Sequence, residues 1–154
     1  ATPENKPAVK PSAKPVKIIY DTLPKTRPAA TANPANIEKK APESITEGKD
    51  KSYPWHSEQI VIEIWDGNNV DNDRITVWLN GNEILKNYVL AKEKKKLVLP
   101  VGGNELNIIT IVADNEGADP PNTANIMLWD NEVPYEVIAH NTVGKKALIK
   151  IRKR

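Results

Sequence analysis

The clearest chemistry in this sequence lies in one short segment, 66–73, which reads DGNNVDND. It holds three Asp and three Asn in eight residues, between two apolar stretches. Carboxylate and Asn oxygens suit Ca²⁺, which takes about six to eight oxygen ligands. Asp66, Asp71 and Asp73 are therefore predicted calcium ligands. The competing interpretation is an ordinary turn, because Asp and Asn side chains also cap nearby backbone amides.

A second acidic segment, 113–119 (ADNEGAD), adds Asp114 to the predicted ligands. If the strands bring both segments to one end of the domain, their carboxylates repel unless a cation lies between them. The spacing is not that of an EF-hand, whose loop has its glycine at the sixth position, whereas Gly67 is second here. The prediction is a possible Ca²⁺ site without a recognised motif, with Mg²⁺ as a weaker alternative.

Three of the four tryptophans, Trp65, Trp78 and Trp129, align with polar neighbours on the strands expected around them. A half-exposed indole can stack on a sugar ring, accept a cation or anchor a protein interface. These residues are the predicted stacking positions of a carbohydrate-binding module. The alternative is that a loop or the N-terminal segment covers each ring.

Few residues suit nucleophilic or zinc catalysis. The sequence has no Cys, and residues 55–154 contain one Ser, Ser57, and two His, His56 and His140. A Ser nucleophile needs a nearby base, and two His without a thiolate give little support for a zinc site. Paired carboxylates, as in glycoside hydrolases, leave a glycan-active enzyme as a weak third hypothesis. We expect a protein that is not an enzyme.

From Trp55 onward hydrophobic residues alternate with polar ones, which indicates β-strands. The expected strands are 59–65, 74–80, 83–90, 95–101, 106–113, 122–129, 135–140 and 146–153. Asn80-Gly81 is typical of a tight hairpin, and the apolar run LNIITIVA at 106–113 predicts a central strand. The fold class is all-β: an antiparallel β-sandwich of about 7–8 strands, similar to immunoglobulin or jelly-roll folds.

The N-terminal third has a different composition. Residues 1–54 hold nine of the thirteen prolines and a net charge of +4, whereas 55–154 have a net charge of −2. This distribution gives no case for nucleic-acid binding. It predicts an extended Pro/Lys-rich tail (1–54) joined to a sandwich domain (55–154). Within the tail, 16–23 is a possible docking strand, for a partner or for its own domain. Its docking residues are Val16, Ile18, Ile19, Tyr20 and Leu23.

The sequence contains no run of about 18 apolar residues, so no transmembrane helix is expected. An Ala at the start of a polar, Pro-rich segment is typical of a cleaved signal peptide, although a trimmed chain would look the same. We therefore expect an exported protein.

Two segments, IWDGNNVDNDRITVWLNGNEILKNYVL and NIITIVADNEGADPPNTANIML, resemble an uncharacterised module of exported proteins from Bacteroidota-type bacteria. That family has the pattern W/Y-D-x-G-x-x-D-G-D, then L-N-G, then N-x-G-x-x-P-P-N-T-A, and the likeness covers about residues 58–154. This sequence departs from it at Asn72, where the family has glycine. The resemblance implies a β-sandwich in the cell envelope or outside the cell, often after a Pro/Lys-rich spacer. It implies no activity.

Two functions are compatible with these features. The first is an exported accessory subunit of a cell-envelope complex, in the periplasm or at the cell surface and associated with the outer membrane. Its tail would dock on a partner protein while the sandwich projects. The alternative is a calcium-assisted module that binds a polysaccharide through its tryptophans.

Overall fold

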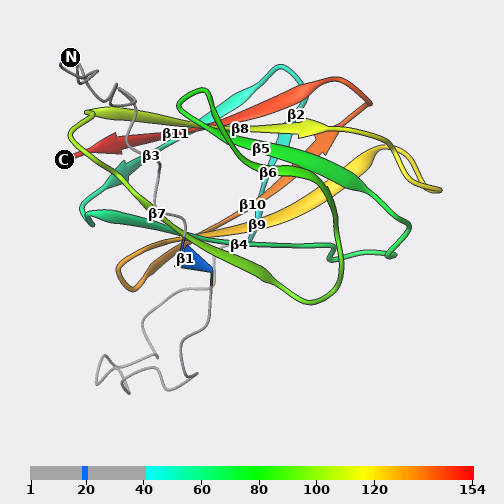
Figure 1. Cartoon of the computed structure of the whole chain (residues 1–154), viewed down its shortest axis with the longest axis horizontal. Coiled ribbons are helices and arrows are strands. Elements are labelled where there is room, and N and C mark those ends of the chain that lie inside the picture. The colour runs from blue at the N-terminus through cyan, green and yellow to red at the C-terminus, as the bar shows by residue number, and fades with distance from the viewer. Residues whose placement is uncertain (1–18, 21–40) are drawn as a thin grey trace, which may run out of the picture.

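The computed structural model describes residues 19–20 and 41–154, and these form two stacked β-sheets (Figure 1). The described residues contain no helix, so the expected all-β sandwich is confirmed. No helix able to span a membrane occurs in this part of the chain. The strands are β1 (Ile19–Tyr20), β2 (Glu43–Thr46), β3 (Asp50–Trp55), β4 (Gln59–Trp65), β5 (Arg74–Leu79), β6 (Asn82–Val89), β7 (Lys95–Pro100), β8 (Leu106–Ala113), β9 (Asn122–Asp130), β10 (Val133–Asn141) and β11 (Lys146–Lys153).

The six-stranded sheet has the order β1-β7-β4-β9-β10-β2, and the five-stranded sheet has the order β3-β11-β8-β5-β6. Most neighbours are antiparallel as expected, but β2 runs parallel to β10 and β3 runs parallel to β11. The two parallel pairs have one cause. β2 and β3 reverse direction at a short turn, and each joins the edge of a different sheet beside two strands that are themselves antiparallel.

The sandwich begins before Trp55, so the expected domain boundary is too late. Strands β2 and β3 belong to the two sheets, and Ile45, Tyr53 and Trp55 are buried in the core between them. The Trp55 indole Nε1 donates a hydrogen bond to the backbone oxygen of Gln59 at 2.9 Å. These strands are difficult to predict from the sequence, because both are short, their outer faces are polar and the residues around them are typical of a linker.

Alternation along the strands sets the core as expected. Ile60, Ile62 and Ile64 on β4 are at most 1% exposed, and the equivalent positions on β5 and β11 are also buried. β8 lies between β11 and β5, which confirms its central place. Asn80 and Gly81 have φ angles of 51° and 83° and close the β5–β6 hairpin. This is the left-handed geometry that an Asn-Gly turn provides.

The predicted docking strand pairs with this chain's own sheet over the residues that the structure describes. Ile19 and Tyr20 form β1, antiparallel to β7, with Ile19 opposite Val98. Val16, Ile18 and Leu23 lie outside the described residues. Pairing within the chain was one of the two roles expected for this segment, and docking on a partner stays a prediction.

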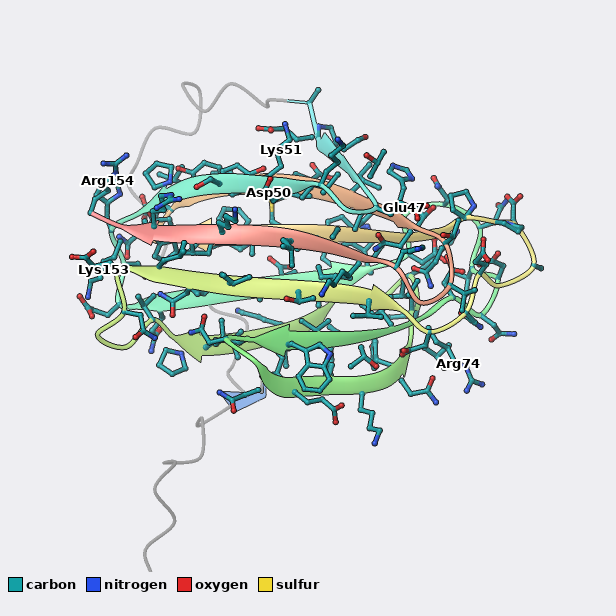
Figure 2. The ribbon with its side chains drawn as sticks, turned by 90° about the horizontal axis from the view of Figure 1, so that it is seen from above. Glu47, Asp50, Lys51, Arg74, Lys153 and Arg154 are labelled. Carbon is teal, nitrogen blue, oxygen red and sulfur yellow. The ribbon has the colours of Figure 1, made fainter. Side chains whose placement is uncertain are left out.

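The basic C-terminal strand is not a sheet edge, because β11 lies between β3 and β8. Figure 2 looks onto this sheet and shows Asp50 and Lys51 on the neighbouring edge strand β3. Lys150 pairs with Asp50 and lowers the pKa of that carboxyl, and Lys51 pairs with Glu43 at 3.0 Å. Exposed pairs of this kind contribute little to stability. They leave less free positive charge on this sheet than the sequence suggests.

Candidate metal centre

Both acidic loops lie at the same end of the sandwich, on the right in Figure 1 and opposite the C-terminus. The first loop joins β4 to β5, and the second joins β8 to β9. They are bonded to each other: the Ala118 amide donates to the Asp71 backbone oxygen at 3.3 Å, and Asn115 Nδ2 donates to the Asn72 backbone oxygen at 2.8 Å. The expected meeting of the two acidic loops is therefore present.

Three carboxylates form a cluster, the acidic triad of Asp66, Asp71 and Asp73. One oxygen from each lies within 4.8 Å of the others. Calcium–oxygen distances are about 2.3–2.6 Å, so two oxygens on opposite sides of one ion are about 5 Å apart. The triad therefore has the spread needed to bind one Ca²⁺. The two carboxyls of a glycoside hydrolase are usually farther apart, at about 5–9.5 Å.

A backbone amide orients each carboxylate of the triad. Asn68 N donates to Asp66 Oδ1 at 2.9 Å. Asp119 N donates to Asp71 Oδ2 at 2.6 Å, and Thr123 N donates to Asp73 Oδ2 at 2.8 Å. Two of these donors come from the opposite loop or from β9, so segments distant in sequence orient the triad.

Two oxygens of the triad are buried without a partner. Asp66 and Asp73 are 2% and 3% exposed, and Asp66 Oδ2 and Asp73 Oδ1 accept no hydrogen bond from any described residue. Burial raises the pKa of Asp73 to about 6, against the hydrogen bond from Thr123, and the charges of Asp71 and Asp66 raise it further. A buried carboxylate with an unused oxygen is unfavourable unless a counter-charge compensates it. These two oxygens are therefore suited to bind a cation.

Gly117 packs closely against two carboxylates of the triad. A Cβ at this position would lie 2.6 Å from Asp71 Oδ2 and 2.7 Å from Asp73 Oδ1, and the backbone φ is 61°. Both the conformation and the contact exclude an ordinary side chain here. Glycine at this position therefore lets the second loop approach the two carboxylates closely.

The structure does not place the predicted ligand Asp114 in the triad. Its Oδ2 accepts a hydrogen bond from Thr76 Oγ1 at 2.7 Å, and the same hydroxyl accepts from Asn87 N at 3.0 Å. Asp114 therefore orders the contact between β5 and β6 in the five-stranded sheet. Its position directly after β8 explains this: two more residues follow it before Gly117 brings the chain to the triad.

The triad faces a cavity of about 250 Å³, called here the triad cavity. Three of its wall residues were not among the predicted calcium ligands: Asp119, Thr123 and His140. His140 lies opposite Thr123 in the β9–β10 register. Only strand pairing places this histidine beside the acidic loops, and no local pattern reveals it. Asp119 had a visible signal, because it follows Gly117 in the second acidic segment.

The asparagines of the resemblance pattern join the two loops, and Asn115 and Asn122 are called here the loop latch. Asn122 is buried, and its Nδ2 donates to the backbone oxygens of Arg74 and Asn115, both at 2.9 Å. Asn115 Oδ1 accepts from Arg74 N at 2.6 Å. Asn72, which stands where the family has glycine, has a φ of 72°, a conformation that asparagine tolerates. The departure from the pattern is therefore compatible with the loop.

The three predicted stacking residues do not share one surface. Trp65 and Trp129 lie on the six-stranded sheet and Trp78 on the five-stranded sheet, and all three are half-buried. Lys94 Nζ lies 4.4 Å from the centre of the Trp65 ring. Trp129 Nε1 donates to Glu63 Oε1 at 2.5 Å. The described residues thus offer no common platform formed by all three rings.

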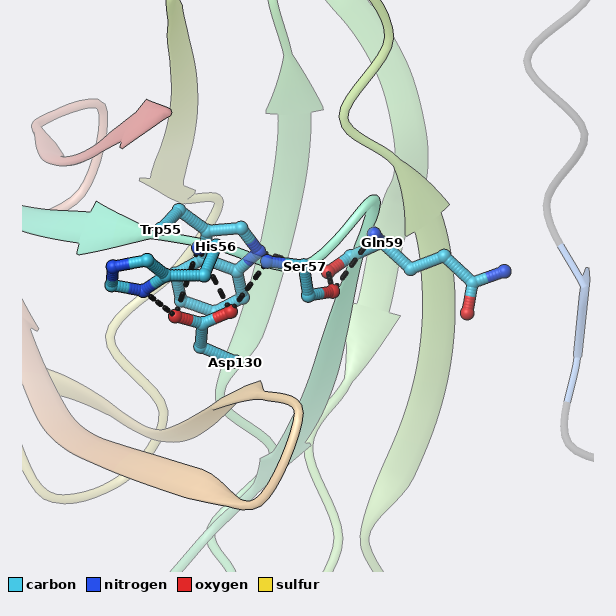
Figure 3. A network of polar contacts seen from close by, with 5 residues as sticks. All are labelled: Trp55, His56, Ser57, Gln59 and Asp130. Carbon is cyan, nitrogen blue, oxygen red and sulfur yellow. Dashed lines mark hydrogen bonds and ion pairs between the residues drawn. The ribbon is translucent and has the colours of Figure 1, made fainter. Parts of the chain in front are cut away.

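A Ser, a His and an Asp meet at the opposite end of the sandwich (Figure 3). Asp130 is buried and accepts hydrogen bonds from the backbone amides of His56 and Ser57, and His56 Nδ1 lies 3.0 Å from Asp130 Oδ2. The Ser57 hydroxyl instead donates to the Gln59 backbone oxygen at 2.6 Å. The arrangement orders the β3–β4 turn, and its serine hydrogen bonds to backbone as a turn residue does.

Comparisons of this chain with protein-family profiles, with curated proteins and with solved structures find no match. The resemblance to an exported bacterial module therefore stays a prediction.

Proposed function

We propose that this chain is a non-enzymatic, calcium-dependent binding module. The observation that carries the proposal is the acidic triad, in which two buried carboxylate oxygens have no hydrogen-bond partner among the described residues. Backbone amides already orient the three carboxylates, so binding an ion requires little further loss of side-chain conformational entropy. Calcium is favoured over magnesium because Mg²⁺ gives up its water reluctantly and is seldom held by protein groups alone.

In this proposal the module is an exported accessory subunit of a cell-envelope complex, and its basic N-terminal segment docks on a partner protein. The charge difference between the two parts of the chain supports this division. Export suits the cation as well, because extracellular calcium modules work with dissociation constants of about 10⁻⁴–10⁻³ M. The hydrogen bonding of Ser57 to backbone supports a role in binding rather than catalysis.

Calorimetric titration of chelator-treated protein with Ca²⁺ tests the metal site. We expect one ion per chain, with a dissociation constant of about 10⁻³ M or lower. Asp73→Asn should weaken binding at least about tenfold, because it removes one charge from the triad. Asp114→Asn is the matched control, since this carboxylate lies outside the triad, and it should bind calcium like the natural sequence. No binding at about 10 mM Ca²⁺ would overturn the proposal.

Isolation of the protein from its native membrane fraction tests the accessory role. Envelope proteins should co-elute in fixed ratio with the full chain, and a double substitution Ile18→Asp and Leu23→Asp should abolish this by placing charges in the apolar docking segment. Ala8→Asp, elsewhere in the same tail, is the control and should retain the partner. If the double variant retained the partner as the control does, docking through 16–23 would be refuted.

A further inference from the structure

A second cavity adjoins the triad cavity. It measures about 390 Å³ and shares Pro120, Pro121 and His140 with the triad cavity. Glu47, Glu116 and the threonines Thr46 and Thr142 complete its walls. Its volume is within the range of ordinary small-molecule sites, about 300–1,000 Å³. We call it the side cavity.

A calcium ion on the triad would have free coordination positions. The triad offers its three carboxylates, and one oxygen of each already accepts a backbone amide. Calcium takes about six to eight oxygens, so several must come from the cavity side. Water fills such positions by default, and a ligand with two adjacent oxygens can replace two waters at once.

The charge of the walls selects the kind of ligand. The two cavities are lined by six carboxylates and a single histidine: Asp66, Asp71, Asp73, Asp119, Glu47, Glu116 and His140. One Ca²⁺ neutralises two of the six negative charges. Anionic ligands are therefore repelled, whereas a neutral ligand rich in hydroxyl groups can donate hydrogen bonds to the remaining carboxylates. A cationic ligand would compete with the calcium ion for the triad.

Polar and apolar walls meet in the side cavity in the way a sugar requires. Pro120 and Pro121 present ring carbons, and Glu47 presents a carboxylate that Thr142 Oγ1 already orients at 3.0 Å from Oε1. A sugar ring has an apolar face of C–H groups and an edge of hydroxyls. The His140 ring lies between the cavities, within reach of a ligand that spans both.

We propose that the side cavity is a subsite for a neutral sugar residue, whose adjacent hydroxyls complete the coordination of a calcium ion on the acidic triad. The inference rests on the proposed calcium site and names the ligand class that the site serves. It replaces the tryptophans with Pro120, Pro121 and His140 as the sugar-contacting surface, because the three indoles share no face.

Native affinity gels cast with neutral polysaccharides test the inference. The panel should include mannan, dextran and xyloglucan, each run with the full chain in calcium and in EGTA. We expect retardation on at least one polymer in calcium and none in EGTA. Retardation by no polymer of the panel in calcium would overturn the inference.

Substitutions locate the binding surface. His140→Ala should weaken retention about tenfold, the effect of removing one good contact, while calorimetric calcium binding is retained. Glu116→Gln should weaken it too, and Glu83→Gln, on the exposed part of β6, is its matched control and should not. If Trp78→Ala abolished retention and His140→Ala did not, the stacking surface on the five-stranded sheet would replace this one.

The failures of the two proposals are distinguishable. Calcium binding by calorimetry without retention on neutral polymers defeats the sugar subsite and leaves the calcium module intact. Absence of calcium binding defeats both. Calcium-independent binding of polylysine, with no retention on neutral polymers, would show that the acidic end takes a cationic partner and would overturn the inference.

Discussion

Replacing Asp73 by Asn should stabilise the calcium-free protein and reduce its stabilisation by calcium. The substitution keeps the shape of the side chain and an oxygen able to accept the Thr123 amide, but removes the negative charge. In the calcium-free protein that charge is buried at 3% exposure beside Asp71 and Asp66. The same charge becomes favourable once a cation is bound, so one substitution should act in opposite directions.

The magnitude follows from the pKa of Asp73, which rises from 3.8 to about 6 on folding. At pH 7.5 the ionised group therefore opposes folding by at most about 3 kcal/mol, at about 1.4 kcal/mol per unit of pKa. Water and salt at the mouth of the triad cavity reduce this, so a gain of about 1–3 kcal/mol is expected for calcium-free Asp73→Asn. In the natural sequence, calcium at 100 times its dissociation constant should add about 2.7 kcal/mol.

Urea unfolding at pH 7.5, with EGTA and then with saturating calcium, measures both effects. In EGTA the variant should unfold at the higher urea concentration; calcium should stabilise the natural sequence by more than it stabilises the variant. Asp114→Asn should follow the natural sequence within about 0.5 kcal/mol in both conditions. If calcium stabilised Asp73→Asn as much as the natural sequence, Asp73 would not be a ligand and the reasoning from its unpartnered oxygen would fail.

Three other substitutions or conditions give separate tests. Gly117→Ala should weaken calcium binding at least about tenfold and destabilise the fold by about 1–2 kcal/mol, since its Cβ enters the triad at a φ of 61°; calorimetry and urea unfolding measure the two effects. Because the pKa of Asp73 is raised, its protonated carboxyl favours folding; this contribution is fully present below about pH 4 and is lost as pH rises through about 6. Without calcium, the natural sequence should therefore lose stability relative to Asp73→Asn as pH rises through this range, which melting curves measure. Asp130→Ala leaves the amides of His56 and Ser57 without their acceptor, so it should lower stability by about 2–3 kcal/mol without changing calcium affinity.

Period-two alternation predicted most of the sheet, because a strand with one face in the core repeats its burial every second residue. Ile60, Ile62 and Ile64 show this pattern and are buried as expected. The alternation did not predict β2 and β3, because each joins a sheet edge through few buried residues. Their parallel pairing also depends on strands about 90 residues later in the chain. Sequence alone carries no signal for such distant pairing.

The candidate site divides in the same way. The triad comes from one loop, so its residue types and spacing pointed to it directly. Asp114 and Asp119 look equivalent in sequence. Only the path of the β8–β9 loop past Gly117 distinguishes them: Asp119 lines the triad cavity, whereas Asp114 accepts a hydrogen bond from Thr76. His140 reaches the cavity through strand register, which no local pattern reports.

The loop latch, rather than the ion, should determine whether the acidic end is folded. Asn122 donates two hydrogen bonds that join the ends of the loops, and backbone amides bond the triad, so we expect both arrangements to persist when calcium is removed. Removal of calcium should therefore lower the melting temperature but leave the circular dichroism spectrum and the protease resistance of the loops unchanged at 25 °C. Asn122→Ala should do the reverse: it removes two hydrogen bonds made by a buried side chain, costs about 2–4 kcal/mol and exposes the loops to protease even in calcium. If chelation alone made the loops as sensitive to protease as Asn122→Ala does, the ion would be a folding cofactor. The triad could not then be a preformed site.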